Sequence, residues 1–192
     1  MHGLSGARLS TDGRVKDVRA DHVARYRWAA ELIRGHVIDA GCNSGYGSAI
    51  LADAGLTVTG IDNWKPGLDY ARRHWDRPGI FWMTADLEQI VKLPPAAAVV
   101  AFEVIEHLND PTPLLREARQ VAGRLFASVP NQAVWPHERR LYPVHKRHYT
   151  RAEFEELLIG SGWREIEWWG QLGGESQVER EVNGRTLVVA CR

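Results

Sequence analysis

The 192-residue chain has few of the features that mark secreted, membrane or nucleic-acid-binding proteins. Its two cysteines, Cys42 and Cys191, are too few for a disulfide framework. No apolar run approaches the roughly 18 residues of a membrane span, and the first residues, MHGLSGARLSTDGR, lack an apolar signal core. Lysine plus arginine equals aspartate plus glutamate, at 24 each, so no global field attracts nucleic acid or an anionic membrane. These absences predict a soluble, cytoplasmic protein.

The sequence also lacks the G-x-G-x-x-G fingerprint of dinucleotide-binding folds. The segment VIDAGCNSGYGS, residues 37–48, has its glycines at Gly41, Gly45 and Gly47, with Asn43 between the first two. This spacing argues against a nicotinamide-dependent dehydrogenase. Asparagine tolerates a left-handed backbone better than most residues, so we expect a positive φ at Asn43 or a side chain that faces a ligand.

Strand and helix patterns alternate along most of the chain. Residues 1–20 are polar and interrupted by glycines, which predicts a flexible N-terminal arm or lid, and residues 21–192 are expected to form a single domain. Near the end, a helix with a capping box from Thr150 to Glu153 precedes two strand patterns, WREIEWWGQ and RTLVVACR. The alternation with short links predicts an α/β fold with a doubly wound, mostly parallel, Rossmann-like sheet.

Four acids stand at the ends of predicted strands. In such sheets, ligands bind outside the carboxyl ends of the strands. Asp39, just before Gly41, would be unfavourable beside a pyrophosphate but favourable beside a cationic group. Asp62 can accept hydrogen bonds from both hydroxyls of a ribose, and Asp86 suits an exocyclic amine such as that of adenine. Glu103 follows the fourth strand.

In these motifs the chain resembles the class I S-adenosylmethionine-dependent methyltransferases. VIDAGCNSGYGS is similar to their first motif, VTGID to the second, MTADLEQI to the third, and FEVIEHLNDP to the segment after the fourth strand. The segments DHVARYRWAAELI and HKRHYTRAEFEELLIGSGW resemble the terminal segments of a branch rich in small-molecule and sugar O-methyltransferases. The resemblance implies a seven-stranded sheet whose last two strands form an antiparallel hairpin.

The resemblance also implies S-adenosylmethionine as the cofactor, with its methionine portion near the glycine loop. Asp39 and the loop from Gly41 through Asn43 to Gly45 would hold this portion. Tyr26, in the helix before the first strand, would reach the cofactor carboxylate.

The remaining strand ends would hold the nucleoside. Asp62, with its neighbour Asn63, would bind the ribose, and Asp86 with the backbone of Leu87 would bind the adenine. Glu103 completes the set of expected cofactor residues.

Methyl transfer from a sulfonium is an in-line displacement in which positioning supplies most of the acceleration. A hydroxyl acceptor also benefits from a general base, and histidine suits that work near neutral pH. The candidates are His107, past the fourth strand, and His145 and His148, in the insertion after the fifth. His145 is preferred and His107 comes second, because the resembling branch often has a histidine five residues before the capping threonine, here Thr150.

Residues 135–151, WPHERRLYPVHKRHYTR, are rich in basic and aromatic residues and contain one acid, Glu138. Such a cluster near the strand ends suits a small polar acceptor, anionic or glycosylated, and we expect O-methylation. Neither a nucleic acid nor a membrane is an expected partner. The sequence leaves the acceptor, the methylated atom and the oligomeric state open.

Two other functions remain open. The run EVIEH, residues 103–107, with the later His145 also resembles the metal-binding set of small-RNA 3′-end 2′-O-methyltransferases, in which a divalent ion would polarise a ribose hydroxyl. The net charge of the chain is zero, which gives little electrostatic attraction for RNA, and we expect no metal site. The other alternative is a cofactor-binding fold that regulates without catalysis.

Overall fold

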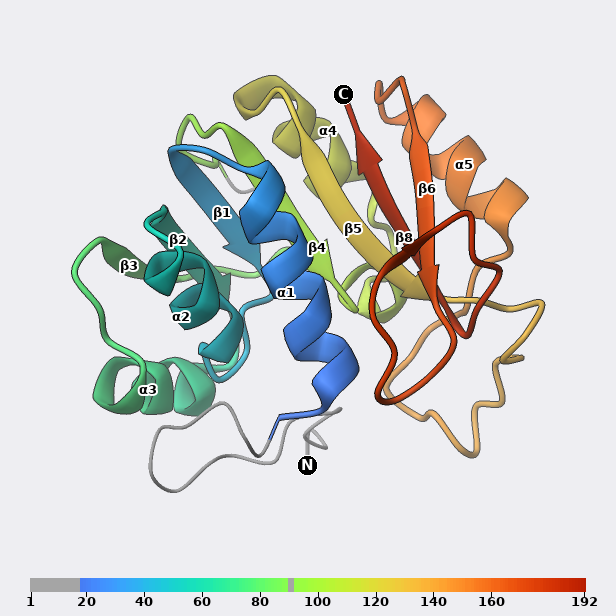
Figure 1. Ribbon diagram of the computed structural model, residues 1–192, viewed down its shortest axis with the longest axis horizontal. Coiled ribbons are helices and arrows are strands. Elements are labelled where there is room, and N and C mark those ends of the chain that lie inside the picture. The colour runs from blue at the N-terminus through green and yellow to red at the C-terminus, as the bar shows by residue number, and fades with distance from the viewer. Residues whose placement is uncertain (1–17, 90–91) are drawn as a thin grey trace.

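The computed structural model describes residues 18–89 and 92–192, which form one sheet with helices on both of its faces (Figure 1). Residues 1–17 of the expected arm lie outside the described part of the chain. None of the helices within the described ranges is long and apolar enough to span a membrane.

The described residues contribute eight strands to the sheet, in the order β3-β2-β1-β4-β5-β8-β6-β7. In chain order, the strands are β1 His36–Ala40, β2 Thr57–Asp62, β3 Ile80–Thr84, β4 Ala98–Phe102, β5 Leu125–Pro130, β6 Glu167–Gln171, β7 Glu179–Arg180 and β8 Thr186–Cys191. Pairing is parallel from β3 to β5, whereas β8 runs antiparallel to both β5 and β6.

The mostly parallel Rossmann-like sheet and its C-terminal antiparallel hairpin are therefore confirmed. The sheet has one strand more than the seven expected, because β7 pairs with the outer edge of β6 through two residues. A two-residue strand is too short to leave a pattern in the sequence.

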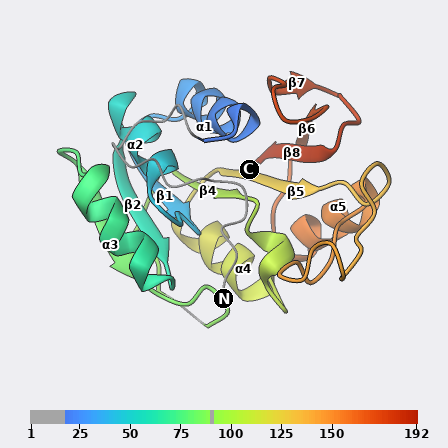
Figure 2. The ribbon, with the colours of Figure 1, turned by 90° about the horizontal axis from the view of Figure 1, so that it is seen from below.

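Five helices and one short 3₁₀ segment accompany these strands in the described ranges. They are α1 Ala20–Leu32, α2 Tyr46–Asp53, α3 Lys65–His74, the 3₁₀ segment η2 Ile105–His107, α4 Thr112–Val121 and α5 Arg151–Gly160. Helices α1, α2 and α3 pack on one face, while α4 and α5 pack on the other (Figure 2). Strand β4 is buried along its whole length because both of its faces are covered.

The capping box expected at the start of α5 is present. Thr150 Oγ1 accepts from the Glu153 amide at 3.3 Å, and Glu153 Oε2 accepts from the Thr150 amide at 2.8 Å. The box begins α5 where the 131–149 connection ends, beside the carboxyl ends of the parallel strands.

The strand order indicates where a ligand could bind at the edge of the sheet. The chain passes from β1 outward to β2 and β3, and then returns to pair β4 with the other side of β1. The order therefore reverses between β1 and β4, which is where doubly wound sheets leave a crevice at their carboxyl ends.

Candidate active site

A cavity of about 740 Å³ lies at the carboxyl ends of β1, β2, β3 and β4. This volume is in the range of small-molecule sites. Most of the residues expected from the sequence line it: Tyr26, Gly41, Asn43, Asp62, Asn63, Asp86, Leu87, Glu103 and His107. Asp39, Gly45 and His145 are not among the lining residues.

The loop after β1 has the left-handed conformations that its residues predicted. The φ angles are 75° at Gly41, 50° at Asn43 and 88° at Gly45, so the positive φ expected at Asn43 is confirmed. A Cβ added at Gly41 would lie 2.4 Å from Val104 Cγ2, so only glycine fits there. Asn43 lines the cavity, while its Oδ1 is buried and has no hydrogen-bond partner among the described residues.

The other two glycines of this loop serve packing. A Cβ at Gly45 would lie 2.5 Å from that of Ala71 in α3. At Gly47, a Cβ would lie 2.1 Å from the Tyr26 ring. These glycines therefore let α2 approach α3 and α1, and Gly45 is not among the residues that line the cavity.

Asp39 has a supporting position behind the cavity. It is fully buried and accepts hydrogen bonds from Tyr26 Oη at 2.9 Å and from Ser48 Oγ at 2.6 Å. Burial raises the pKa of Asp39 to about 6, although these two hydrogen bonds oppose the shift. Tyr26 lines the cavity, and its hydroxyl proton is donated to Asp39.

Asp62 is held by the backbone at the cavity wall. Its Oδ1 accepts from the Trp64 amide and its Oδ2 from the Asn43 amide, both at 2.8 Å. These bonds fix both oxygens, and each oxygen keeps a second lone pair for a ligand donor. The carboxylate can thus receive the two hydroxyls of a ribose without further reorganisation.

The end of β3 presents a similar arrangement. Asp86 Oδ1 accepts from the Glu88 amide at 3.0 Å and from Asn63 Nδ2 at 3.3 Å. Leu87 lies between these acids and lines the cavity with them. An apolar side chain flanked by carboxylates suits a flat heterocycle that carries an amine.

Of the two histidines proposed as the base, the second choice lines the cavity and the preferred one, His145, does not. His107 lines the cavity, and its Nδ1 lies 3.2 Å from the Val144 carbonyl oxygen. A carbonyl only accepts, so Nδ1 carries the proton in the neutral ring and Nε2 keeps a lone pair. Desolvation lowers the pKa of His107, which favours this neutral form.

His145 stands behind His107, with the ring centroids 4.7 Å apart. His148 Nδ1 must donate to the Trp135 carbonyl at 2.7 Å, so His148 Nε2 accepts from His145 Nδ1 at 2.8 Å. Burial lowers the pKa of His145 to about 3. The structure therefore brings His107 to the cavity and gives His145 and His148 a place behind it.

A carboxyl group lies next to this histidine pair. Glu106, His107 and His145 place one potential ligand atom each within 4.8 Å of one another. Glu106 is fully buried, and neither of its carboxyl oxygens has a hydrogen-bond partner in the described part of the chain. Burial and the charge of Glu103 raise the pKa of Glu106 well above its usual range. The three side chains could hold a divalent cation, although the sequence led us to expect no metal site.

Several lining residues were not anticipated. Cys42 and Tyr46 belong to the glycine-loop segment, and His22 lies one helical turn before Tyr26, a spacing that places both on one face of α1. His22 Nδ1 lies 3.0 Å from Tyr46 Oη, and burial lowers the pKa of His22 to about 2. Lys146 also lines the cavity; it belongs to the basic stretch 135–151 but was not singled out within it.

The aromatic residues expected to face an acceptor pack against each other instead. Trp135 Nε1 donates to Tyr142 Oη at 2.6 Å, and their ring centroids are 4.9 Å apart. Arg185 covers the Trp135 ring at 4.3 Å. From this connection, Pro143, Val144 and Lys146 line the cavity.

Comparisons with known proteins agree with this geometry. Residues 38–124 match the family model described as methyltransferase domain. A probable S-adenosylmethionine-dependent methyltransferase of Mycolicibacterium smegmatis is 30% identical over 180 residues, which cover 90% of this chain and 69% of the relative. A relative with the same description from Mycobacterium tuberculosis is also 30% identical, over 89% of this chain, and this chain spans 65% of that relative's length.

Other similarities cover less of the chain or extend to the fold alone. A ubiquinone biosynthesis O-methyltransferase of Actinobacillus pleuropneumoniae is 33% identical over 51% of this chain and 47% of its own length. The CcbJ methyltransferase of Streptomyces caelestis superposes with a TM-score of 0.73 over 90% of this chain and 95% of that chain, at 16% identity. From the mycobacterial relatives and the family model, the chain belongs to the S-adenosylmethionine-dependent methyltransferases.

Proposed function

We propose that the protein transfers a methyl group from S-adenosylmethionine to a hydroxyl group of a small polar acceptor. The observation that carries this proposal is the row of strand-end residues around the 740 Å³ cavity, above all Asp62 with both oxygens fixed by backbone amides. Gly41, Cys42 and Asn43 line the same cavity, so a ligand there would lie against the loop after β1.

The residues present fit each part of the cofactor. Asp62 would bind the ribose hydroxyls, Asp86 and Leu87 would bind the adenine, and the loop from Gly41 to Asn43 would carry the methionine portion. When bound, S-adenosylmethionine supplies a methyl group on an already activated sulfur leaving group. The protein's task is then to position the acceptor and to remove its proton.

His107 is the residue we assign to proton removal. His107 lines the cavity, and the Val144 carbonyl fixes its tautomer, so Nε2 keeps its lone pair at 3.9 Å from Glu106 Oε1. His145 contacts the His107 ring from behind and has its own Nδ1 committed to His148. The need for a base favours a hydroxyl acceptor, and the similarity to a ubiquinone biosynthesis O-methyltransferase agrees with O-methylation.

The acceptor would enter past Pro143, Val144 and Lys146. An exposed ammonium group at this entrance favours an acceptor with an anionic group, such as a carboxylate or a phosphate. A glycosylated acceptor has less support, since Trp135 and Tyr142 use their rings on each other.

The test is an acceptor screen that measures S-adenosylhomocysteine release, followed by mass spectrometry of the product. We expect turnover with anionic hydroxyl compounds, a product heavier by the mass of one methyl group less the hydrogen that it replaces, and an O-linked methyl group. His107→Gln should reduce kcat by about 10²–10⁴-fold while leaving cofactor affinity unchanged, and His145→Gln should have the smaller effect. Cofactor binding without turnover on any acceptor would favour the regulatory alternative.

A second candidate, metal-assisted transfer to an RNA ribose hydroxyl, has one specific observation in its favour. Glu106, His107 and His145 converge, and the unpartnered Glu106 carboxyl could exchange its proton for a cation. Titration with Mg²⁺ and Mn²⁺ would test this, with Glu106→Gln as the matched variant. Activity that requires a divalent ion and disappears with chelator would replace the proton-removal role of His107 by metal activation.

A further inference from the structure

Arg25 is an unusual residue for the interior of a small fold. It lies on α1, is 1% exposed, and is among the largest fully buried side chains of the described residues. Its Nη1 donates to Gln171 Oε1 at 2.7 Å. Its Nε and Nη2 are buried and have no hydrogen-bond partner in residues 18–89 and 92–192. Burying an incompletely paired cation is costly, so stability alone does not explain this residue.

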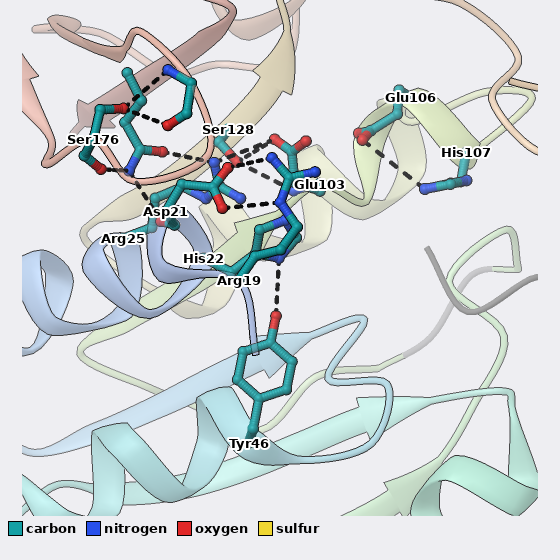
Figure 3. A network of polar contacts seen from close by, with 12 residues as sticks. Arg19, Asp21, His22, Arg25, Tyr46, Glu103, Glu106, His107, Ser128 and Ser176 are labelled. Carbon is teal, nitrogen blue, oxygen red and sulfur yellow. Dashed lines mark hydrogen bonds and ion pairs between the residues drawn. The ribbon is translucent and has the colours of Figure 1, made fainter. Parts of the chain in front are cut away.

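The Arg25 guanidinium lies beside the cavity carboxylate of Glu103, at 4.0 Å from Nη1 to Oε1 (Figure 3). The same Oε1 accepts from Ser128 Oγ at 2.8 Å, and the Glu103 amide donates to the Ser128 carbonyl oxygen at 3.2 Å. Glu103 has a φ of 54°, which is unfavourable for a residue with a side chain. A strained backbone with fixed contacts at a cavity is typical of a functional position.

Arg25 is itself held by Gln171, through the same Nη1 that lies near Glu103. Gln171, at the end of β6, donates from Nε2 to the carbonyl oxygens of Asp21 and Ser176, at 2.9 Å each. These bonds fix the amide, and its Oε1 then fixes the Arg25 guanidinium. The C-terminal hairpin therefore sets the position of a charge next to the site.

The strand order indicates what Glu103 would meet. The cofactor residues follow the order β3, β2, β1, for adenine, ribose and methionine respectively, and β4 is the next strand. Glu103 follows β4, so it would face the end of the cofactor that carries the ammonium and sulfonium charges. A carboxylate there would attract both cations.

We propose that Glu103 is the counter-ion of the cationic end of S-adenosylmethionine and that Arg25 is the positioning residue that keeps its carboxylate there. This proposal rests on the cofactor placement described above. Arg25 acts through Glu103 and not by touching the cofactor, since it is not among the residues that line the cavity. Ser128 completes the arrangement from β5.

Calorimetric binding of S-adenosylmethionine and S-adenosylhomocysteine to matched variants tests this. The two ligands share the ammonium group, but only the first has a sulfonium charge. Glu103→Gln should weaken S-adenosylmethionine binding by about tenfold or more, and S-adenosylhomocysteine binding less. Arg25→Gln should shift the affinities in the same direction, and Arg25→Lys, which keeps a charge, should lose less. Arg27→Gln, an exposed change on the same helix, should bind like the parent.

The variant that combines Glu103→Gln with Arg25→Gln decides whether Arg25 acts through Glu103. If it does, Arg25→Gln adds little to the loss caused by Glu103→Gln. Losses that multiply, or a folded Arg25→Gln protein that binds like Arg27→Gln, would overturn the proposal. If Arg25→Gln does not fold, Ser128→Ala frees the same Glu103 oxygen and must show the same non-additivity.

A wrong assignment of Arg25 can be distinguished from a wrong placement of the cofactor by a variant at the ribose carboxylate. Asp62→Ala should weaken binding of both ligands at least tenfold, whatever Arg25 does. Retained affinity in that variant would reject the cofactor placement, whereas lost affinity with no effect at Arg25 would reject the positioning role alone.

Discussion

Replacing Tyr26 by phenylalanine removes one hydroxyl group from behind the loop after β1 and leaves the rest of the ring in place. That hydroxyl donates to Asp39 Oδ1 at 2.9 Å, and both residues are buried. After the change, Asp39 keeps only the hydrogen bond from Ser48 Oγ. The buried carboxylate then lacks one of its two side-chain donors.

The expected cost depends on the charge of Asp39. Its pKa is raised from 3.8 to about 6, mainly by burial, so the group is ionised at pH 8 and protonated at pH 5. Loss of a hydrogen bond to a charged group costs about 1.5–3 kcal/mol, against about 0.5–1.5 kcal/mol for a neutral pair. Tyr26→Phe should therefore lower the free energy of unfolding by about 1 kcal/mol more at pH 8 than at pH 5.

Asp39→Asn removes the charge that creates this difference. A carboxyl group whose pKa is raised on folding stabilises most below its unfolded pKa of 3.8, and this contribution is lost as the pH rises through about 6. The shift from 3.8 to about 6 corresponds to a penalty of about 3 kcal/mol at pH 8, which asparagine does not carry. In the Asp39→Asn background, the cost of Tyr26→Phe should be small and independent of pH.

Urea unfolding of the four proteins of this cycle at pH 5 and pH 8 is the measurement. Tyr149→Phe is the matched control, because Tyr149 is 5% exposed, like Tyr26, and its hydroxyl has no hydrogen-bond partner in the part of the chain that is described. A Tyr26→Phe protein as stable as Tyr149→Phe at pH 8, or a cost that is equal at both pH values and additive with Asp39→Asn, would refute this reasoning.

Three further changes test other parts of the structure. Burial keeps His22 neutral with a pKa near 2, so its stabilisation is present above the unfolded pKa of 6.5 and is lost below it. His22→Gln should reduce the loss of unfolding free energy between pH 7 and pH 5 by up to about 2 kcal/mol in urea titrations, and an unchanged slope would contradict this. Gly47→Ala, whose Cβ would meet the Tyr26 ring, should cost about 1–3 kcal/mol, whereas Gly123→Ala, with nothing within 4 Å, is its near-neutral control in thermal unfolding. Thr150→Ala removes the α5 capping box and should lower stability by about 1 kcal/mol in urea unfolding; no loss would deny the cap an energetic role.

The parallel part of the fold could be predicted because local patterns and topology rules agree there. A five-residue apolar run such as β4 is diagnostic of a strand covered on both faces, and strand-end acids such as Asp62 and Asp86 then fall at one edge. The left-handed backbone at Asn43 was also accessible, because few residue types tolerate it.

What the sequence could not give depends on side-chain direction and long-range contacts. Asp39 lies next to the glycine loop in sequence but points toward Tyr26 and Ser48. His107 lines the cavity and His145 does not, because of the path of the 131–149 connection, whose Val144 carbonyl contacts His107. The burial of Arg25 could not be predicted from its helix, because its partners, Gln171 and Glu103, are far away in the chain.

The most direct measurement is calorimetric binding of S-adenosylmethionine and of NAD to the parent protein and to Asp62→Ala. We expect the parent to bind S-adenosylmethionine and not NAD, and Asp62→Ala to lose the ribose contacts and at least tenfold in affinity while remaining folded. Asp53→Ala, an exposed acid on α2, should bind like the parent. Binding of NAD in place of S-adenosylmethionine, or full affinity in Asp62→Ala, would contradict the site as described.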